Sequence, residues 1–189
     1  NQTDTHGRNA LFYAIYHNQE EIFNLLIEKG CDYQLQDDQG RNILHTASYF
    51  GRTSIVKIIL NIRCDKSNLH NLILQKDNFG CTSFHYAVAQ RNEEIADNLL
   101  QLQGETVLNE KDNKGISAFL YACQQAESDE WVEYLLDEGA DIDTLDNDGQ
   151  SALHYSVLSR NNDVIRTILC YFIENDDLSG LHHLLNQRA

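Results

Sequence analysis

The chain has 189 residues, and 42% of them are hydrophobic, which is enough for one ordinary domain with a real core. Its formal net charge of −15 argues against direct binding to nucleic acid, because a strongly acidic surface repels phosphate groups. No segment approaches about 18 uninterrupted apolar residues, so the sequence predicts neither a transmembrane helix nor insertion into a membrane.

The net charge belongs entirely to the second part of the chain. Residues 1–76 hold 8 Lys and Arg against 8 Asp and Glu, whereas residues 77–189 hold 6 against 21. An acidic surface of this kind favours a partner protein with a basic segment. The alternative explanation is solubility alone.

Two further features of the composition bear on location and extent. The five cysteines are odd in number and include no Cys-x-x-Cys pair, which favours buried thiols in a reducing compartment, the cytoplasm or the nucleus. The chain contains no Met. We therefore expect a processed or excised piece, and one domain of a longer protein.

Five segments of the chain share one pattern. Each opens with Asp-x-x-Gly, and the spacings between successive glycines are 33, 40, 35 and 34 residues. The glycines are Gly7, Gly40, Gly80, Gly115 and Gly149. A turn that requires a positive φ explains this position, because only glycine adopts such a φ without steric cost.

Each segment also predicts a pair of short helices. Two residues after each glycine comes a residue that caps helix N-termini: Asn9, Asn42, Thr82, Ser117 and Ser151. An apolar residue and then a small residue follow at a fixed register, before a second apolar run at helical spacing. One such unit cannot bury its apolar face alone, so the units are expected to stack.

This pattern resembles the ankyrin repeat, whose consensus runs Asp-x-x-Gly-x-Thr-Pro-Leu-His-x-Ala-Ala. The resemblance covers about residues 3–172 and implies an all-α solenoid of stacked helix-turn-helix repeats with hairpin-like turn tips. We expect a single ankyrin-repeat domain over 1–189, with repeats at about 4–36, 37–76, 77–111, 112–145 and 146–176 and a partial or capping repeat at 177–189. The consensus Pro is absent from all five copies, which should cost some stability without changing the fold.

The spacing is irregular in three places. About seven extra residues fall around Asp65 to Gln75, and one extra residue falls near Glu127 to Glu130, between two predicted helices. Asp177-Leu178-Ser179-Gly180 resembles the start of a sixth, degenerate unit.

Histidines and tyrosines recur at fixed positions in the segments, and each set has a structural and a functional interpretation. His45, His85 and His154 share the register of the ankyrin His, which in the family hydrogen-bonds to backbone between repeats; a metal or acid–base role is the alternative. The tyrosines just after this register are read as a half-buried framework between helix layers, or else as a binding stripe: Tyr13, Tyr86, Tyr121 and Tyr155. The adjacent His182 and His183 have no Cys or acidic partner at zinc-site spacing.

The sequence contains no nucleotide-binding loop, zinc-protease motif or nucleophile elbow. We therefore expect no enzyme, no metal and no cofactor, and no small-molecule substrate. Intrinsic enzymatic or metal-dependent activity is kept as a third hypothesis, behind the two that follow.

The ankyrin resemblance implies that a partner meets the concave face, formed by the turn tips and the exposed side of the first helices. Transferred to this sequence, the predicted contact residues are Arg8, Tyr16, His17, Arg41, Tyr49, Phe50, Phe79, Gln90, Ile116, Gln124 and Gln125. The aromatic members gather in the first three copies, and exposed aromatic residues are typical of interface hot spots. We predict a protein–protein interaction module that acts as an adaptor, scaffold or inhibitor. The alternative is a regulatory or substrate-targeting segment of a larger enzyme.

Overall fold

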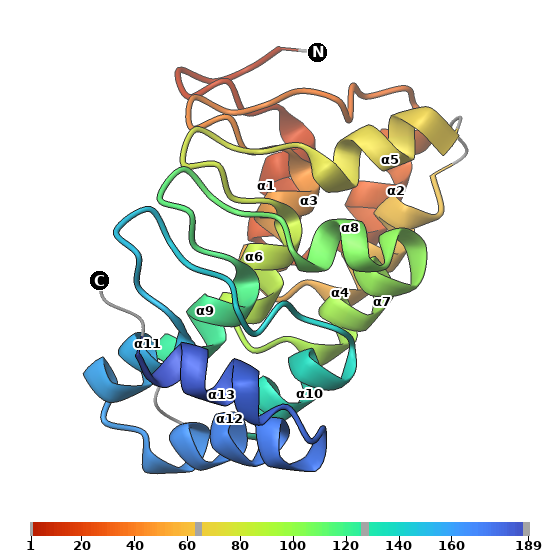
Figure 1. Ribbon diagram of the computed structural model, residues 1–189. Helices are drawn as coiled ribbons and strands as arrows, with labels where there is room; N and C mark the ends of the chain where they lie inside the picture. Colours follow the sequence, from red (N-terminus) through yellow and green to blue (C-terminus); the bar gives the residue numbers. More distant parts are fainter. Residues whose placement is uncertain (1, 63–65, 126–128, 187–189) are drawn as a thin grey trace. The chain divides into compact units, whose positions relative to one another are not determined.

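The computed structural model describes residues 2–62, 66–125 and 129–186. Within these residues the chain forms thirteen helices and no strand, with one isolated antiparallel bridge between Lys111 and Ser117 (Figure 1). The predicted all-α fold of helical repeats is therefore confirmed.

Ten of the helices form five pairs, one pair for each predicted repeat. The first helix of every pair has seven residues: α1 (Ala10–Tyr16), α3 (Ile43–Tyr49), α6 (Ser83–Ala89), α9 (Ala118–Gln124) and α11 (Ala152–Leu158). The second helices are α2 (Glu20–Glu28), α4 (Thr53–Leu60), α7 (Glu93–Gln103), α10 (Glu130–Asp137) and α12 (Asn162–Glu174).

The chain divides into two compact units, residues 1–107 and 108–189, called unit 1 and unit 2 below. In unit 1, α3 packs against α1 and α6, while α4 packs against α2 and α7. The residues between these two layers are fully buried and make the core of the unit: Leu11, Ile15, Phe23, Leu44, Ile55, Phe84 and Ile95. Each repeat thus covers the apolar face of its neighbour, which is how stacked repeats gain stability.

Unit 2 is built in the same way. Its first helices α9 and α11 pack on each other, and α12 packs against α10 and α11. Its core includes Phe119 and Phe172, which are almost completely shielded from solvent, and the larger Trp131, which is 8% exposed.

The turn tips confirm the predicted role of glycine. All five tip glycines have φ between 74° and 82°. At Gly40 the need is also steric, since a Cβ would stand 2.6 Å from Asn78 Oδ1. Asn78 donates from its side chain to the Asp38 carbonyl, at 3.0 Å, and from its backbone to Gln39, at 2.9 Å, and so joins successive tips.

The five predicted N-cap residues cap their helices in the structure. Asn42 Oδ1 accepts from the backbone of Leu44 at 2.9 Å and of His45 at 3.0 Å. Thr82 and Ser151 form capping boxes with the histidine three residues later, so part of the role of His85 and His154 is to complete a cap within their own repeat.

Aspartate organises each tip, a role that was not predicted from the sequence. One carboxylate oxygen of the tip aspartate accepts from two backbone N–H groups, and in four repeats the other accepts from a tyrosine hydroxyl nine residues later. These Asp–Tyr pairs are Asp4–Tyr13 at 2.8 Å, Asp77–Tyr86 at 2.5 Å, Asp112–Tyr121 at 2.8 Å and Asp146–Tyr155 at 2.7 Å. The framework reading of the tyrosines is therefore right for the half-buried Tyr86 and Tyr121 and the buried Tyr155, whereas Tyr13 is 46% exposed.

Repeats two and three each carry a short helix outside the five pairs, and one of these helices fills an irregular spacing. The extra residues of repeat two form α5 (Lys66–Leu74), and α8 (Glu105–Leu108) follows α7 in repeat three. Asn42 donates to the Leu72 carbonyl at 2.9 Å, just as Asn9 in repeat one donates to the Asp32 carbonyl at 2.7 Å. The inserted helix thus supplies the acceptor that the loop after α2 supplies in repeat one.

The start of a sixth unit is present as α13 (Leu178–Leu185), which packs on α12. Parts of two predicted features, Asp65 and the segment before Asp129, lie outside the described residues.

Candidate functional site: the groove between α1 and α3

Six of the eleven predicted contact residues come together in one groove of unit 1. The groove has a volume of about 430 Å³ and is called the α1–α3 groove below. Its predicted members are Arg8, Tyr16, His17, Arg41, Tyr49 and Phe50, and its unpredicted members are Phe12, Tyr13, Asp37 and Thr46. The groove exists because the first helices of repeats one and two pack on each other and place equivalent positions side by side.

One end of the groove is a cluster of rings. Phe50 lies between Tyr16 and Tyr49, with ring centroids 4.9 and 5.0 Å apart and nearly perpendicular ring planes. Tyr16 also makes an edge contact with His17 at 5.3 Å. Edge-to-face contacts hold aromatic side chains in fixed positions, so this part of the groove is preorganised for an apolar side chain.

The Arg52 side chain links the end of α1, which carries Tyr16, to the ring of Phe50. Its guanidinium donates to the carbonyls of Ile15 and Tyr16, at 3.2 and 3.1 Å, and lies 5.9 Å from the centroid of Phe50. These carbonyls belong to the last turn of α1, where a cation is favourable because helix C-termini carry partial negative charge. Arg52 therefore positions the cluster without lining the groove.

The other end of the groove holds two arginine–aspartate pairs. Arg8 contacts Asp4 at 2.8 Å and Arg41 contacts Asp37 at 2.7 Å. Desolvation alone would raise the pKa of Asp4, but hydrogen bonds from the backbone and side chain of Arg8 and from Tyr13 hold it well below its usual range. Asp4 is therefore a carboxylate at neutral pH, and its charge is matched by Arg8.

The remaining predicted contact residues lie outside the groove. Phe79 stands at the tip of repeat three and is 58% exposed, and Gln90 is an exposed residue at the end of α6. Gln124 and Gln125 end α9 in unit 2.

Ile116 requires a correction, because only 8% of it is exposed. The residue after the tip glycine lies against its own turn, where a long arginine still reaches solvent but a shorter isoleucine is covered. Ile116 therefore does not belong to a contact surface.

The repeated histidine position has a structural role, as His45 shows. His45 is fully buried, and its Nε2 donates to the Cys81 carbonyl at 3.0 Å, from repeat two to repeat three. Burial lowers the pKa of His45, so the ring is neutral at pH 7 and its Nδ1 accepts from the Asn42 backbone at 3.2 Å. This is the inter-repeat hydrogen bond that the ankyrin resemblance implies.

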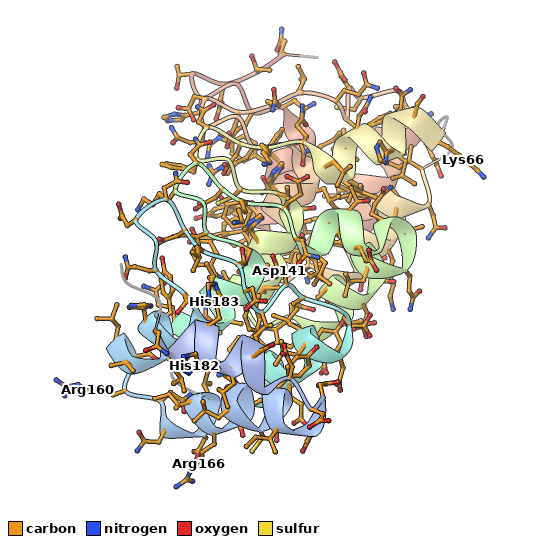
Figure 2. All side chains as sticks on the ribbon, in the orientation of Figure 1. Lys66, Asp141, Arg160, Arg166, His182 and His183 are labelled. Carbon is orange, nitrogen blue, oxygen red and sulfur yellow. The ribbon has the colours of Figure 1, made fainter. Side chains whose placement is uncertain are left out.

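No group of three or more His, Cys, Asp or Glu in the described part of the chain is placed to hold a metal ion. His182 and His183 are exposed neighbours on α13 (Figure 2). Among the described residues, no helix is both long enough and apolar enough to cross a membrane.

Unit 2 offers a different surface. It holds 5 Lys and Arg against 16 Asp and Glu, whereas unit 1 holds 9 against 13. Its Arg160 and Arg166 point away from the ribbon (Figure 2). Helices α1 and α3 of unit 1 end in Tyr16 and Tyr49, whereas α11 of unit 2 ends in Leu158, which is 68% exposed.

Comparison with known proteins gives one family. Family models of ankyrin repeats match residues 6–38, 30–112 and 84–178. Among curated proteins, the chain is 27% identical over 196 residues to the human transient receptor potential cation channel subfamily A member 1, which covers 97% of this chain and 16% of that protein. It is 32% identical over 68 residues to the putative ankyrin repeat protein L92 of Acanthamoeba polyphaga mimivirus, which covers 36% of this chain and again 16% of the relative.

The chain thus spans about one sixth of the length of these curated relatives. The family models together cover nearly all of the described residues. The chain belongs to the ankyrin-repeat family.

Proposed function

We propose that this chain is a protein-interaction module, acting as an adaptor, scaffold or inhibitor, that holds a partner protein in the α1–α3 groove. Ankyrin repeats are generally protein–protein interaction modules, and the fold is typically not catalytic. The observation that carries the proposal is the convergence of six predicted contact residues, from two repeats, on one preorganised cavity. The module is expected to work in the cytoplasm or nucleus.

The test compares two double variants that each truncate two adjacent apolar side chains at the end of a first helix. Tyr49→Ala with Phe50→Ala empties the ring cluster, whereas Val157→Ala with Leu158→Ala removes exposed apolar side chains from unit 2. Partners captured from a lysate by the unaltered chain are identified, and their affinities for the three proteins are measured by calorimetry. If the cluster is a hot spot, the first variant loses on the order of 2 kcal/mol, about 30-fold in Kd.

The control variant is expected to keep the affinity of the unaltered chain, and circular dichroism checks that both variants remain folded. A partner that binds the Tyr49 and Phe50 variant as tightly as the unaltered chain contradicts the groove as the binding site.

A basic segment in the partner is a separate part of the proposal, supported by the charge of unit 2. A basic segment would be steered by the acidic unit, so its association rate should fall when salt is raised from about 50 to about 300 mM. Stopped-flow measurement on an identified partner decides this, and a rate indifferent to salt contradicts the basic segment.

A second candidate concerns the whole protein. Because the chain spans only 16% of the relatives' length, we propose as an alternative that it is the interaction segment of a longer protein, such as a channel or the regulatory or targeting part of an enzyme. Sequencing the natural reading frame tests this, and a frame that encodes only these residues contradicts it.

A further inference from the structure

The unused hydrogen-bonding groups of the α1–α3 groove are mostly donors. Arg8 and Arg41 each use Nε and Nη2 on their aspartate, which leaves both Nη1 groups without a partner in the described part of the chain. The hydroxyls of Tyr16 and Tyr49 also make no hydrogen bond to any described residue. A ligand in this groove therefore meets four groups that can donate.

The charged acceptors near the groove are already satisfied. Asp37 Oδ1 accepts from the backbone of Gln39 and Arg41, and its Oδ2 accepts from the Arg41 guanidinium. Asp4 accepts from two backbone groups, from Arg8 and from the Tyr13 hydroxyl. A ligand cation would thus find no free carboxylate here.

The ring faces are also less open to a cation than a bare aromatic cluster would be. Arg8 lies 5.4 Å from the centroid of Tyr13, and Arg52 lies 5.9 Å from that of Phe50. A second cation would be repelled by these guanidinium groups. Both observations favour an anionic group beside the rings.

We propose that the α1–α3 groove binds a short segment of the partner in which one large apolar side chain adjoins an Asp or Glu. The apolar side chain contacts the rings of Tyr16, Tyr49 and Phe50, and the carboxylate accepts from the free Nη1 groups of Arg8 and Arg41. This inference rests on the proposed function and adds the chemistry of the partner's segment.

The corresponding positions of unit 2 do not offer this chemistry. Ile116 and Gln150 stand where Arg8 and Arg41 stand in unit 1, and Gln124 and Leu158 stand where the two tyrosines stand. The acidic–apolar segment is therefore assigned to repeats one and two alone, while a basic segment, where a partner has one, would meet unit 2.

Four fluorescein-labelled peptides test the proposal by anisotropy with the whole chain. They share one Gly/Ser frame and differ at the centre, which reads Glu-Trp-Glu, Gln-Trp-Gln, Lys-Trp-Lys or Glu-Ala-Glu. We expect the Glu-Trp-Glu peptide to bind at least ten-fold tighter than each of the other three. Equal or tighter binding of the Gln or Lys peptide, or no measurable binding of the Glu-Trp-Glu peptide, overturns the proposal.

Charge variants locate the effect. Arg8→Gln is expected to reduce the preference for Glu over Gln several-fold, and the double variant Arg8→Gln with Arg41→Gln to abolish it. Arg160→Gln removes the same charge from unit 2, where the side chain points away from the ribbon (Figure 2), and should leave the preference unchanged. An unchanged preference for Glu over Gln in the Arg8 variant also overturns the proposal. The single variant is less disruptive to folding than the double variant, because Asp4 keeps its hydrogen bond from Tyr13.

The outcome is separable from that of the proposed function. If a natural partner depends on Tyr49 and Phe50 but the peptides show no preference for Glu, the groove binds a protein segment of another chemistry. If the partner is indifferent to Tyr49 and Phe50, the interaction site itself lies elsewhere.

Discussion

Units 1 and 2 share the structure of the turn tip but differ in the residues beside the tip and at the end of the following helix. Both use a tip aspartate that accepts from the backbone two and four residues later, as Asp37 and Asp146 show. Beside this common frame, Arg41 and Tyr49 of unit 1 correspond to Gln150 and Leu158 of unit 2. Framework positions therefore repeat because every repeat must fold, whereas positions that face solvent are free to differ between units.

The largest expected effect tests whether the two units also unfold separately. Phe23→Ala in unit 1 and Phe172→Ala in unit 2 each empty a fully buried site, and each should cost about 3–5 kcal/mol. Trp131, the only tryptophan, lies in the core of unit 2, so its fluorescence reports on that unit while circular dichroism reports on all helices.

In urea, the Phe172 variant should lose its tryptophan signal at a lower midpoint than its helical signal, and the Phe23 variant should show the reverse order. Coincident midpoints in both variants would instead support the proposal of a single domain over residues 1–189, in which the two units unfold as one.

A smaller effect is expected at the Asp–Tyr pairs of the tips. Tyr86→Phe and Tyr155→Phe remove only a hydroxyl that donates to a buried carboxylate, and each should cost about 1.5–3 kcal/mol, because hydrogen bonds to charged groups are the stronger ones. Urea unfolding measures the loss. Tyr13→Phe is the matched control, since Tyr13 is exposed and Asp4 keeps its bonds from Arg8; a loss there as large as at Tyr155 would contradict the argument from burial.

The cost of removing the Tyr155 hydroxyl is also expected to depend on pH. Burial would raise the pKa of Asp146, but hydrogen bonds from Tyr155 and from the backbone of Gln150 and Asp148 lower it. A carboxyl group whose pKa is lower in the folded than in the unfolded state stabilises the fold at every pH above its unfolded-state pKa, near 3.8. This contribution to the free energy of unfolding is lost as the pH falls below that value. The cost of Tyr155→Phe should therefore shrink below about pH 4, as followed by urea midpoints at pH 3 and 7.

How much of this was predictable depends on whether a residue's role is local. The N-caps and tip glycines were predicted because backbone φ and capping act within a few residues, and five copies repeat the signal. The sequence predicts the tip aspartate only as part of a motif, although a tyrosine stands nine residues after it in four repeats and signals their pairing. Its bond to that tyrosine closes only when the tip folds back onto the first helix.

The groove was predicted by register but not as a cavity. Register identified Tyr16, Tyr49 and Phe50, but Phe12 and Thr46 join the lining only through the packing of α1 on α3. Helix α5 is predicted only as extra residues, although Leu69, Leu72 and Ile73 stand at i, i+3 and i+4, the helical spacing that buries Leu72 and Ile73.

The smallest expected effect is the pH dependence of the link from repeat two to repeat three. Burial lowers the pKa of His45, so the unfolded chain takes up a proton that the folded chain resists. The stability from neutral His45 is complete above about pH 6.5 and is lost as pH falls below it, by at most about 1.4 kcal/mol for each pH unit.

His45→Gln keeps a donor towards the Cys81 carbonyl but cannot titrate, so its urea midpoint should fall less than that of the unaltered chain between pH 7.5 and 5.5. His182→Gln removes an exposed imidazole from unit 2 and serves as the control. If the stability of His45→Gln fell with pH as much as that of the unaltered chain, protonation of the buried histidine would not be the source of the pH dependence. The hydrogen bond from His45 to Cys81, between repeats two and three, would then not be weakened by acid.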